Sequence, residues 1–590
     1  RPVALAPPRC RFWTALRYNA ASVKKASLLV PPLLFVCLGL AARFLAERAW
    51  AVFTQYKTPF AFPSVETAAA EPVVPRLVLV LLDGLRVDAS RRRPFLNELR
   101  ARRADLECEV GLPSFSLPGR GTLLSGAWQD VHGQTTNMEP RPLAVEHLFQ
   151  VARRRGVLTA LVAGPPPFQL FDPWVDRRFE FPDVPPGKDL PTLDAELGAR
   201  ERTLAKALGD PPAGFLMAEL ISVDEAGHEW GGASPAYSRM AAQVDAAVRR
   251  LADRLDLTRT TLVVTSDHGH TDRGGHGGTE SLVTRVPLVL AGAAVRSGTR
   301  GRARQVDVAP TVAVLLGLPI PASNQGRLLL EHLALSPHQA RAAAARVEAQ
   351  RQAFLAAYAA RLGEPAPVSA RSDSGPAPQA VDLAEATLRS QRLGREVRSR
   401  GLKAAAFLGI LALAAAVLSA LTGWRQVGVA ATAAALGLLA YRLAFPLFGL
   451  GYSMSILNRD EEMAHFFILD MLLAALASAV AAAAAGAWRR RRQPNASRLE
   501  LARLAWLTGA ALVVGFLVRI ASAYVGTGLF LTWHMPDVDV LFAFYLDLLA
   551  LVAVCFAGPM LPLAAWAGAA LAGLRETPHP APEPSRCANL

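Results

Sequence analysis

Long apolar blocks at both ends of the chain constrain its fold more than any other sequence feature. One block covers residues 26–46, and later blocks lie near 404–422, 427–450, 463–488, 502–525 and 539–574. All but the last, which is longer, are close to the ~20 residues that a helix needs to cross a bilayer. Because lipid offers backbone groups no hydrogen-bonding partner, such blocks fold as helices. The sequence therefore predicts a transmembrane anchor at 26–46 and a multi-pass domain of five or six helices at 403–575, the count depending on whether Gly558-Pro559 kinks or divides the last block.

Short basic runs beside these blocks orient the chain in the membrane. Lys24-Lys25 precedes the first block, and Arg425 and Arg489–Arg492 lie between later ones. Basic residues collect on the cytoplasmic side, so 1–25 is expected to be cytoplasmic and the segment after the anchor extracytoplasmic, periplasmic or extracellular if the source is bacterial. A cleaved signal peptide is the alternative for the first block, which is longer than usual for such a peptide. The runs carry no interleaved aromatic residues, so the formal charge of +14 indicates membrane topology and no nucleic-acid binding.

Residues 75–335 have a different pattern. Runs such as 77–82 and 261–266 read as buried strands, and segments such as 237–253 read as helices. Alternating strands and helices are typical of an α/β domain with a mainly parallel sheet flanked by helices. The remaining segments are predicted to be a helical connector at 336–402 and a C-terminal tail at 576–590.

Two polar residues in this domain lie in patterns that, taken alone, are weak evidence for a functional site. Asp83 ends an apolar strand, where α/β sheets place their ligand sites, although Asp-Gly is also a common turn. Ser116 precedes a Pro-Gly turn that leads into a helix of small residues, so amide groups and the helix dipole could favour an oxyanion or phosphate there. The alternative is that Ser114 or Ser116 caps that helix.

Three further groups of residues point to metal binding. Asp224 and His228 are four residues apart, Asp267 and His268 follow an apolar strand, and His276 lies in the glycine-rich loop Gly274–Gly278. A mixture of carboxylate and imidazole ligands suits zinc, with manganese or iron as alternatives. The sequence therefore predicts a metal centre in the α/β domain.

The ordered set Asp83, Ser116, Asp224/His228, Asp267/His268 and His276 resembles the two-metal site of the alkaline-phosphatase superfamily. The type I phosphodiesterase/nucleotide pyrophosphatase and glycosylphosphatidylinositol (GPI) ethanolamine-phosphate transferase branches are the most similar, and the run 306–326 resembles a transferase segment. The layout of anchor, external domain and membrane helices is also similar.

This resemblance implies an alkaline-phosphatase-like fold and two divalent metal ions, zinc or manganese. Asp224, His228 and His276 would hold one ion, and Asp83, Asp267 and His268 the other, with the Ser116 oxygen at or between them. Ser116 would attack phosphorus to form a covalent phospho-enzyme, which water or an acceptor hydroxyl would then resolve. Arg120 and His132 are candidate substrate-binding residues.

Two alternatives remain open from the sequence. Ser116-Leu-Pro-Gly-Arg120 also matches the sulfatase pattern, in which a serine or cysteine becomes formylglycine, but a single hard cation would leave the histidines without a role. The other alternative is a membrane scaffold or transporter with an inactive external domain, which would not need a full set of metal-binding residues.

The membrane half carries Arg442, Asp470, Arg519 and Asp547 at or near membrane depth, where ionisable groups are costly unless paired. Internal pairing is expected, with snorkelling towards headgroups as the alternative for the arginines. The charged loop 458–462 is predicted to face the catalytic side, either solvated or against a headgroup. More helices than attachment needs also suggest a lipid-linked phosphoester substrate.

Overall fold

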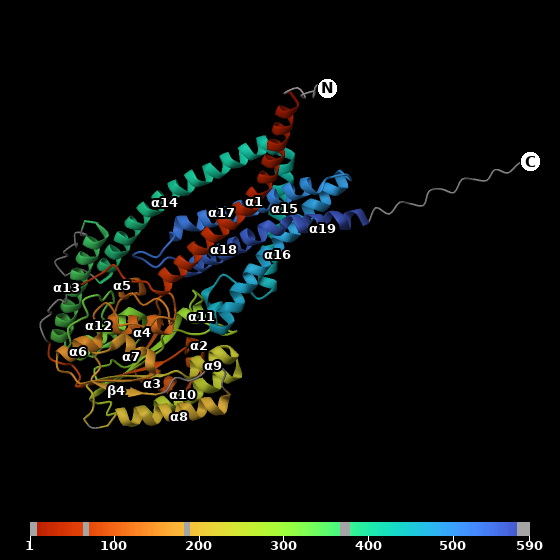
Figure 1. Ribbon diagram of the computed structural model, residues 1–590. Helices are drawn as coiled ribbons and strands as arrows, with labels where there is room; N and C mark the ends of the chain where they lie inside the picture. The colour runs from red at the N-terminus through yellow and green to blue at the C-terminus, as the bar shows by residue number, and fades with distance from the viewer. Residues whose placement is uncertain are drawn as a thin grey trace, which may run out of the picture.

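A computed structural model describes residues 9–62, 70–181, 189–209, 211–365, 378–458 and 460–574. An α/β domain lies at one end and a bundle of long helices at the other, joined by α14 (Figure 1). The predicted tail at 576–590 and the first eight residues of the predicted cytoplasmic segment lie outside the described residues.

One eight-stranded sheet forms the centre of the α/β domain, with the order β4-β3-β5-β1-β6-β7-β2-β8. Only β7 runs antiparallel to its neighbours, so the described sheet is mainly parallel, as predicted. The strands are β1 (Arg76–Leu82), β2 (Ala104–Glu109), β3 (Thr159–Ala163), β4 (Arg177–Glu180), β5 (Phe215–Leu220), β6 (Thr260–Thr265), β7 (Arg285–Gly292) and β8 (Arg300–Arg304).

Alternating side chains of the central strands build two cores, one on each face of the sheet. Along β1, Leu77, Leu79 and Leu81 join one core, and Val78, Val80 and Leu82 join the other, all at 0% or nearly 0% exposure. A strand buried on both faces reads as a continuous apolar run, because helices cover both sides. Figure 1 shows α6 and α12 on one side of the sheet and α8 and α10 on the other. The helices that flank the sheet are α3 (Pro94–Arg102), α4 (Ser116–Ser125), α6 (Leu148–Arg154), α7 (Pro165–Phe171), α8 (Leu190–Ala207), α10 (Pro235–Ala252) and α12 (Val308–Leu315).

Short helices and loops extend from the carboxyl ends of the central strands. These include α2 (Val87–Ser90) after β1, α9 (Ser222–Trp230) after β5 and α11 (Ser281–Thr284) before β7; α5 (Gln129–His132) follows α4. Strands β5, β1 and β6 are parallel neighbours, so the segments that follow them meet at one edge of the sheet. Open α/β sheets bind their ligands at this edge.

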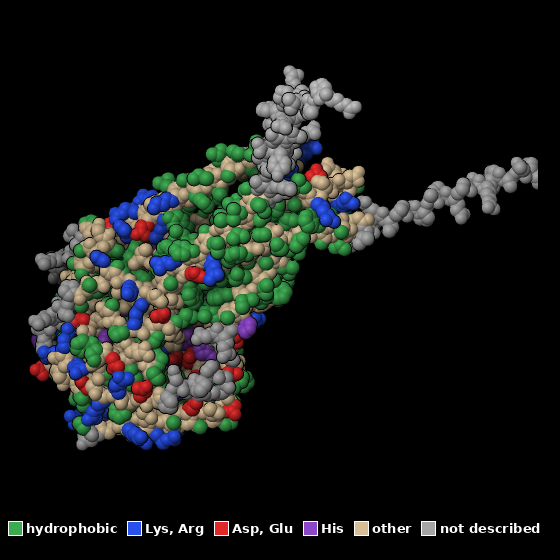
Figure 2. All heavy atoms as spheres, viewed as in Figure 1, with side chains coloured by type: hydrophobic (Ala, Val, Ile, Leu, Met, Phe, Trp, Pro, Cys, Tyr) green, Lys and Arg blue, Asp and Glu red, His purple; other side chains and the backbone are tan. Residues whose placement is uncertain are grey.

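The long helices make this an integral membrane protein. Six helical spans are long and apolar enough to cross a bilayer within the described residues. They are Leu29–Thr54, Ala380–Thr422, Trp424–Leu447, Glu462–Arg492, Arg498–Thr527 and Val538–Gly573. Hydrophobic side chains cover this part of the surface, whereas charged side chains are spread over the α/β domain (Figure 2).

The element bounds refine the predicted membrane domain. The spans lie in α1 (Arg9–Thr54), α14 (Pro378–Thr422), α15 (Trp424–Leu447), α16 (Asp460–Arg492), α17 (Arg498–Thr527), α18 (Val538–Ala557) and α19 (Leu561–Leu574). The short turn Gly558–Met560 separates the last two helices, so one predicted block contains two. In the predicted connector, α13 (Pro337–Leu362) precedes α14 in the chain and packs against it.

Two acids in the membrane domain have partners, as internal pairing predicts. Arg519 contacts Asp547 at 2.7 Å. Asp470 accepts a hydrogen bond from the hydroxyl of Tyr441. Arg442 donates to the hydroxyl of Tyr452 at 3.2 Å. An unpaired buried charge is expensive, so these contacts reduce the cost of polar groups at this depth.

Candidate metal centre and nucleophile

The carboxyl edge of the sheet brings most of the predicted residues together. Asp83 directly follows β1, Asp224 and His228 lie one turn apart on α9, and Asp267 and His268 follow β6. Gly84, which follows Asp83, has a φ of +71°, and a Cβ there would lie 2.8 Å from the Cα of Asp224. A glycine is therefore required for β1 and α9 to approach so closely.

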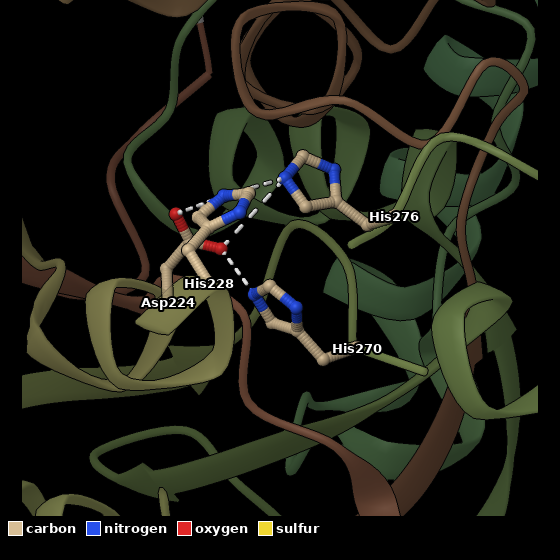
Figure 3. A group of neighbouring side chains, drawn as sticks. All are labelled: Asp224, His228, His270 and His276. Atoms are coloured by element: carbon tan, nitrogen blue, oxygen red, sulfur yellow. Dashed lines mark hydrogen bonds and ion pairs between the residues drawn. The ribbon is translucent and has the colours of Figure 1, made fainter. Parts of the chain in front are cut away.

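One group of four side chains could hold a metal ion: Asp224, His228, His270 and His276 (Figure 3). Their rings and carboxylate point towards one another from α9 and from the loop after β6. The Nε2 atoms of His228 and His276 are 3.2 Å apart, and the Nε2 of His228 lies 3.4 Å from Asp224. The Nε2 of His270 lies 2.6 Å from Asp224 Oδ1. One carboxylate with imidazole nitrogens at this spacing suits zinc.

A second group lies beside the first and shares Asp224 with it. It consists of Asp83, Asp224 and His268, with the Nε2 of His268 3.4 Å from Asp83 Oδ1 and 4.0 Å from Asp224 Oδ1. Asp267 Oδ2 lies 3.9 Å from the same nitrogen. Asp83 Oδ1 and Asp267 Oδ2 are both buried without a hydrogen-bond partner, although the Nη1 of Arg120 lies 3.4 Å from Asp267 Oδ2. A buried carboxylate oxygen without a hydrogen bond is costly, so this group fits a second cation.

The hydrogen bonds of three histidines fix which nitrogen faces the centre. The Nδ1 of His268 lies 3.1 Å from the carbonyl of Gly269, and the Nδ1 of His276 lies 3.0 Å from the carbonyl of Ser114. Carbonyl oxygens only accept hydrogen bonds, so Nδ1 donates and Nε2 keeps its lone pair. The Nδ1 of His228 lies 2.9 Å from the side-chain oxygen of Asn458.

Charges of the residues in the first group are coupled. Burial alone would lower the pKa of His228, but the charge of Asp224 and the hydrogen bonds that the ring donates to Asp224 and Asn458 raise the pKa to about 9. Burial would raise the pKa of Asp224, yet His228 and His270 hold it well below its ordinary value. Burial lowers the pKa of His270 to about 4. The pocket thus keeps Asp224 anionic, and a cation that binds here would displace a proton from His228.

Ser116 begins α4 and lies against the second group. Its Oγ is 3.0 Å from the Nε2 of His268 and 3.5 Å from the side-chain nitrogen of Asn137. The N-cap of α4 is Phe115, with no side-chain cap hydrogen bond, and the Ser114 hydroxyl bonds Gly278 instead. Neither serine therefore caps the helix, which removes the alternative explanation for Ser116.

Arg120 and His132 have different environments from those expected of substrate-binding residues. Arg120 is 4% exposed and contacts Asp83 at 2.6 Å, Glu219 at 2.7 Å and Asp267 at 3.4 Å. His132 is 1% exposed, and its ring nitrogens contact Thr122 and the backbone of Gln134. Both side chains thus contact other protein groups, and direct substrate contact by either residue stays a prediction.

Three residues of the site were not expected from the sequence. His270 is two residues beyond His268, so its short spacing within the same run was the available signal. Asn137 accepts a hydrogen bond from the amide of Leu117 at 2.9 Å, and no sequence pattern marks it. Asn458 is 230 residues from His228 and belongs to the membrane domain, so only the folded chain brings the two together.

Comparisons with known proteins match one family model and several transferases. The family model described as type I phosphodiesterase / nucleotide pyrophosphatase matches residues 169–303. Human GPI ethanolamine phosphate transferase 3, catalytic subunit, is 28% identical over 283 residues, which is 43% of this chain and 26% of that protein. Human GPI ethanolamine phosphate transferase 1 is 25% identical over 358 residues, which is 51% of this chain and 37% of that protein. The chain thus spans about a quarter to a third of the length of the curated relatives it matches.

Solved structures with similar folds include murine ectonucleotide pyrophosphatase / phosphodiesterase 5, with 13% identity and a TM-score of 0.35 over 42% of this chain and 96% of that one. The phosphonate monoester hydrolase of Agrobacterium radiobacter has 18% identity and a TM-score of 0.36 over 44% of this chain and 77% of that one. The family model and the transferase relatives confirm the resemblance seen in the motifs, to the type I phosphodiesterase and GPI ethanolamine phosphate transferase branches of the alkaline-phosphatase-like superfamily.

Proposed function

We propose that this protein is a membrane-anchored, two-metal phosphodiesterase or phosphoethanolamine-type transferase with Ser116 as nucleophile. The observation that carries the proposal is the position of the Ser116 hydroxyl, 3.0 Å from His268 in a metal-binding group that shares Asp224 with a second group. A serine beside paired cation sites suits an in-line displacement at phosphorus, because the cations stabilise the entering and leaving oxygens. The transferase relatives support the same reaction class.

Asp224, His228 and His276, with His270 beside them, would hold one ion, and Asp83, Asp267 and His268 the other. When bound, such a pair of cations polarises the phosphoryl oxygens and favours deprotonated oxygen nucleophiles. Zinc suits the imidazole-rich group, and manganese is the alternative. A single hard cation, as in a sulfatase, would leave His228, His270 and His276 without a role.

Ser116 would replace one ester oxygen on phosphorus, so that a bond from its Oγ forms as the bond to the leaving oxygen breaks. The incoming oxygen of water or of a sugar or lipid hydroxyl would then displace Ser116 and restore the free enzyme. The side-chain nitrogen of Asn137, 3.5 Å from the Ser116 oxygen, is placed to donate to a phosphoryl oxygen.

A cavity beside the metal centre supports a lipid-linked substrate. It has a volume of about 670 Å³ and lies between the α/β domain and the membrane helices. His228 forms part of its wall, with Glu229 and Glu280 on the same side and apolar side chains such as Phe448 and Phe466 on the other. A headgroup could therefore meet the metal centre while its acyl chains stay in the bilayer. In this proposal the catalytic domain lies against one membrane surface, which the basic runs predict to be the extracytoplasmic one.

The test is activity and metal content of the full chain in detergent or liposomes. Wild-type protein should contain two zinc ions per chain and release or transfer the headgroup of a labelled phospholipid. Ser116→Ala should keep both ions and lose turnover. Protein that carries no transition metal, or that turns over equally with Ser116→Ala, would sink the proposal and favour a scaffold with an inactive domain.

A further inference from the structure

One loop of the membrane domain touches the metal centre directly. Residues 453–458 connect α15 to α16, and two of their side chains bond the catalytic domain. The hydroxyl of Ser455 accepts from the amide of Gly278 at 2.9 Å and donates to Glu280 at 2.7 Å. The amide group of Asn458 bonds His228 twice, through Oδ1 to the ring at 2.9 Å and through Nδ2 to the backbone carbonyl at 2.8 Å.

The glycine-rich loop around His276 is shaped to admit this membrane loop. A Cβ on Gly275, whose φ is +85°, would lie 2.1 Å from the carbonyl oxygen of Ser455. A Cβ on Gly278 would lie 2.1 Å from the hydroxyl oxygen of Ser453. Both distances are far below van der Waals contact, so side chains there would push the two domains apart. The glycines therefore let the two domains meet at the metal centre, in addition to bending the backbone around His276.

The two bonds from Asn458 fix the orientation of its amide. A backbone carbonyl only accepts hydrogen bonds, so the group facing the carbonyl of His228 must be the NH₂. The amide oxygen then faces the ring, and the Nδ1 of His228 must donate to it. Nδ1 thus carries a proton, so Nε2, which faces Asp224 and His276, is the nitrogen that would bind a metal ion.

His268 and His276 are held in the same tautomer by backbone carbonyls of the α/β domain. For His228 the corresponding acceptor comes from the membrane domain. Acceptors of this kind set the ring orientation and raise the basicity of a metal ligand, and losing one lowers metal affinity by roughly 10–100-fold.

We propose that Asn458 is a positioning residue for the metal ligand His228, so that the membrane domain completes the metal centre of the catalytic domain. The membrane helices then do more than anchor the enzyme. Their docking onto the α/β domain sets the affinity of the first metal group, and the same loop forms a wall of the cavity beside it. This inference rests on the proposed metal centre but not on the identity of the substrate.

The experiment uses the full chain, stripped of metal and titrated with zinc against a chromophoric chelator. Asn458→Leu keeps the size of the side chain and removes both bonds, Asn458→Ala removes them with a smaller group, and Asn458→Asp keeps an acceptor for Nδ1. Ser455→Ala is the matched control, because it breaks the other contacts of the same loop and leaves His228 untouched. The visible spectrum of the cobalt-loaded protein gives a second readout at the ligand itself.

We expect Asn458→Leu and Asn458→Ala to weaken one of the two zinc sites by roughly 10–100-fold and to change the cobalt spectrum. Asn458→Asp and Ser455→Ala should stay within a few-fold of wild type. Wild-type affinity at both sites in the Leu and Ala variants would overturn the inference, as would an equal loss in Ser455→Ala. Wild-type protein that binds no metal would overturn the proposed function along with it. If Asn458→Leu is not recovered as a monodisperse protein, Asn458→Ala decides.

Discussion

Replacing Arg120 by methionine separates two roles for this side chain. The sequence pattern favoured contact with the substrate, whereas the structure buries the guanidinium between Asp83, Glu219 and Asp267. Arg120→Met keeps much of the side-chain volume and leaves Glu219 without its cationic partner, whereas a metal ion would still neutralise Asp83 and Asp267. Removing one partner from a buried ion pair costs about 3–5 kcal/mol. That is a large share of the roughly 5–15 kcal/mol that stabilises a typical domain.

The assay is thermal unfolding of the full chain in detergent, followed through the α/β domain. One kcal/mol shifts the midpoint of a domain of this size by about 2–4 °C, so the expected fall is about 6–20 °C. The exposed Arg254→Met in the same domain is the control and should change the midpoint little. Glu219→Gln added to Arg120→Met should recover part of the loss, since it removes one stranded charge.

The loss of thermal stability in Arg120→Met should also depend on pH. Burial raises the pKa of Glu219 even though Arg120 opposes the shift, so removing Arg120 raises it further. A carboxyl with a raised folded-state pKa destabilises the fold as the pH rises through that value. The deficit of Arg120→Met should therefore be larger in alkaline than in acidic buffer. An unchanged midpoint together with a raised KM would refute this reasoning and restore a substrate-binding role.

Three further predictions follow from the site. Removing metal with a strong chelator should abolish turnover, and adding zinc should restore it; activity that persists without bound metal would contradict the two-ion centre. Ser116→Ala should lose turnover while zinc content and the unfolding midpoint stay at the wild-type values, which metal analysis and calorimetry would check. His270→Ala should weaken zinc binding by roughly 10-fold or more, and His270→Gln, which can still donate to Asp224, should recover part of it; wild-type affinity in the alanine variant would exclude a role for His270 at the metal.

The sequence correctly predicted the positions of residues that directly follow buried strands. Asp83 and Asp267 each follow a continuous apolar run, and such runs become buried central strands whose carboxyl ends meet at one edge. The apolar blocks also predicted the membrane helices, because bilayer thickness sets their length. These features depend on local patterns, so a single sequence is enough to recognise them.

Side-chain environment was not predictable in this way. Arg120 lies in a motif that also matches the sulfatase pattern, so the motif does not reveal the partners of the guanidinium. Its three carboxylate partners follow from the packing of α4 against the sheet. Asn458 lies in a loop whose charges suggested solvent or a headgroup, yet it bonds a residue 230 positions away. Contacts between the two domains depend on how the domains dock. Neither the periodicity of apolar residues nor the spacing of residues along the chain indicates which surfaces will meet.

The covalent step is the most direct test of the account. The full chain would be mixed briefly with a headgroup-labelled phospholipid, quenched in acid, and the peptide containing Ser116 analysed by mass spectrometry. We predict a phosphate or phosphoethanolamine adduct on Ser116 that is absent in metal-free protein. Steady turnover with Ser116 unmodified at every quench time, or formylglycine at this position, would contradict the proposed mechanism.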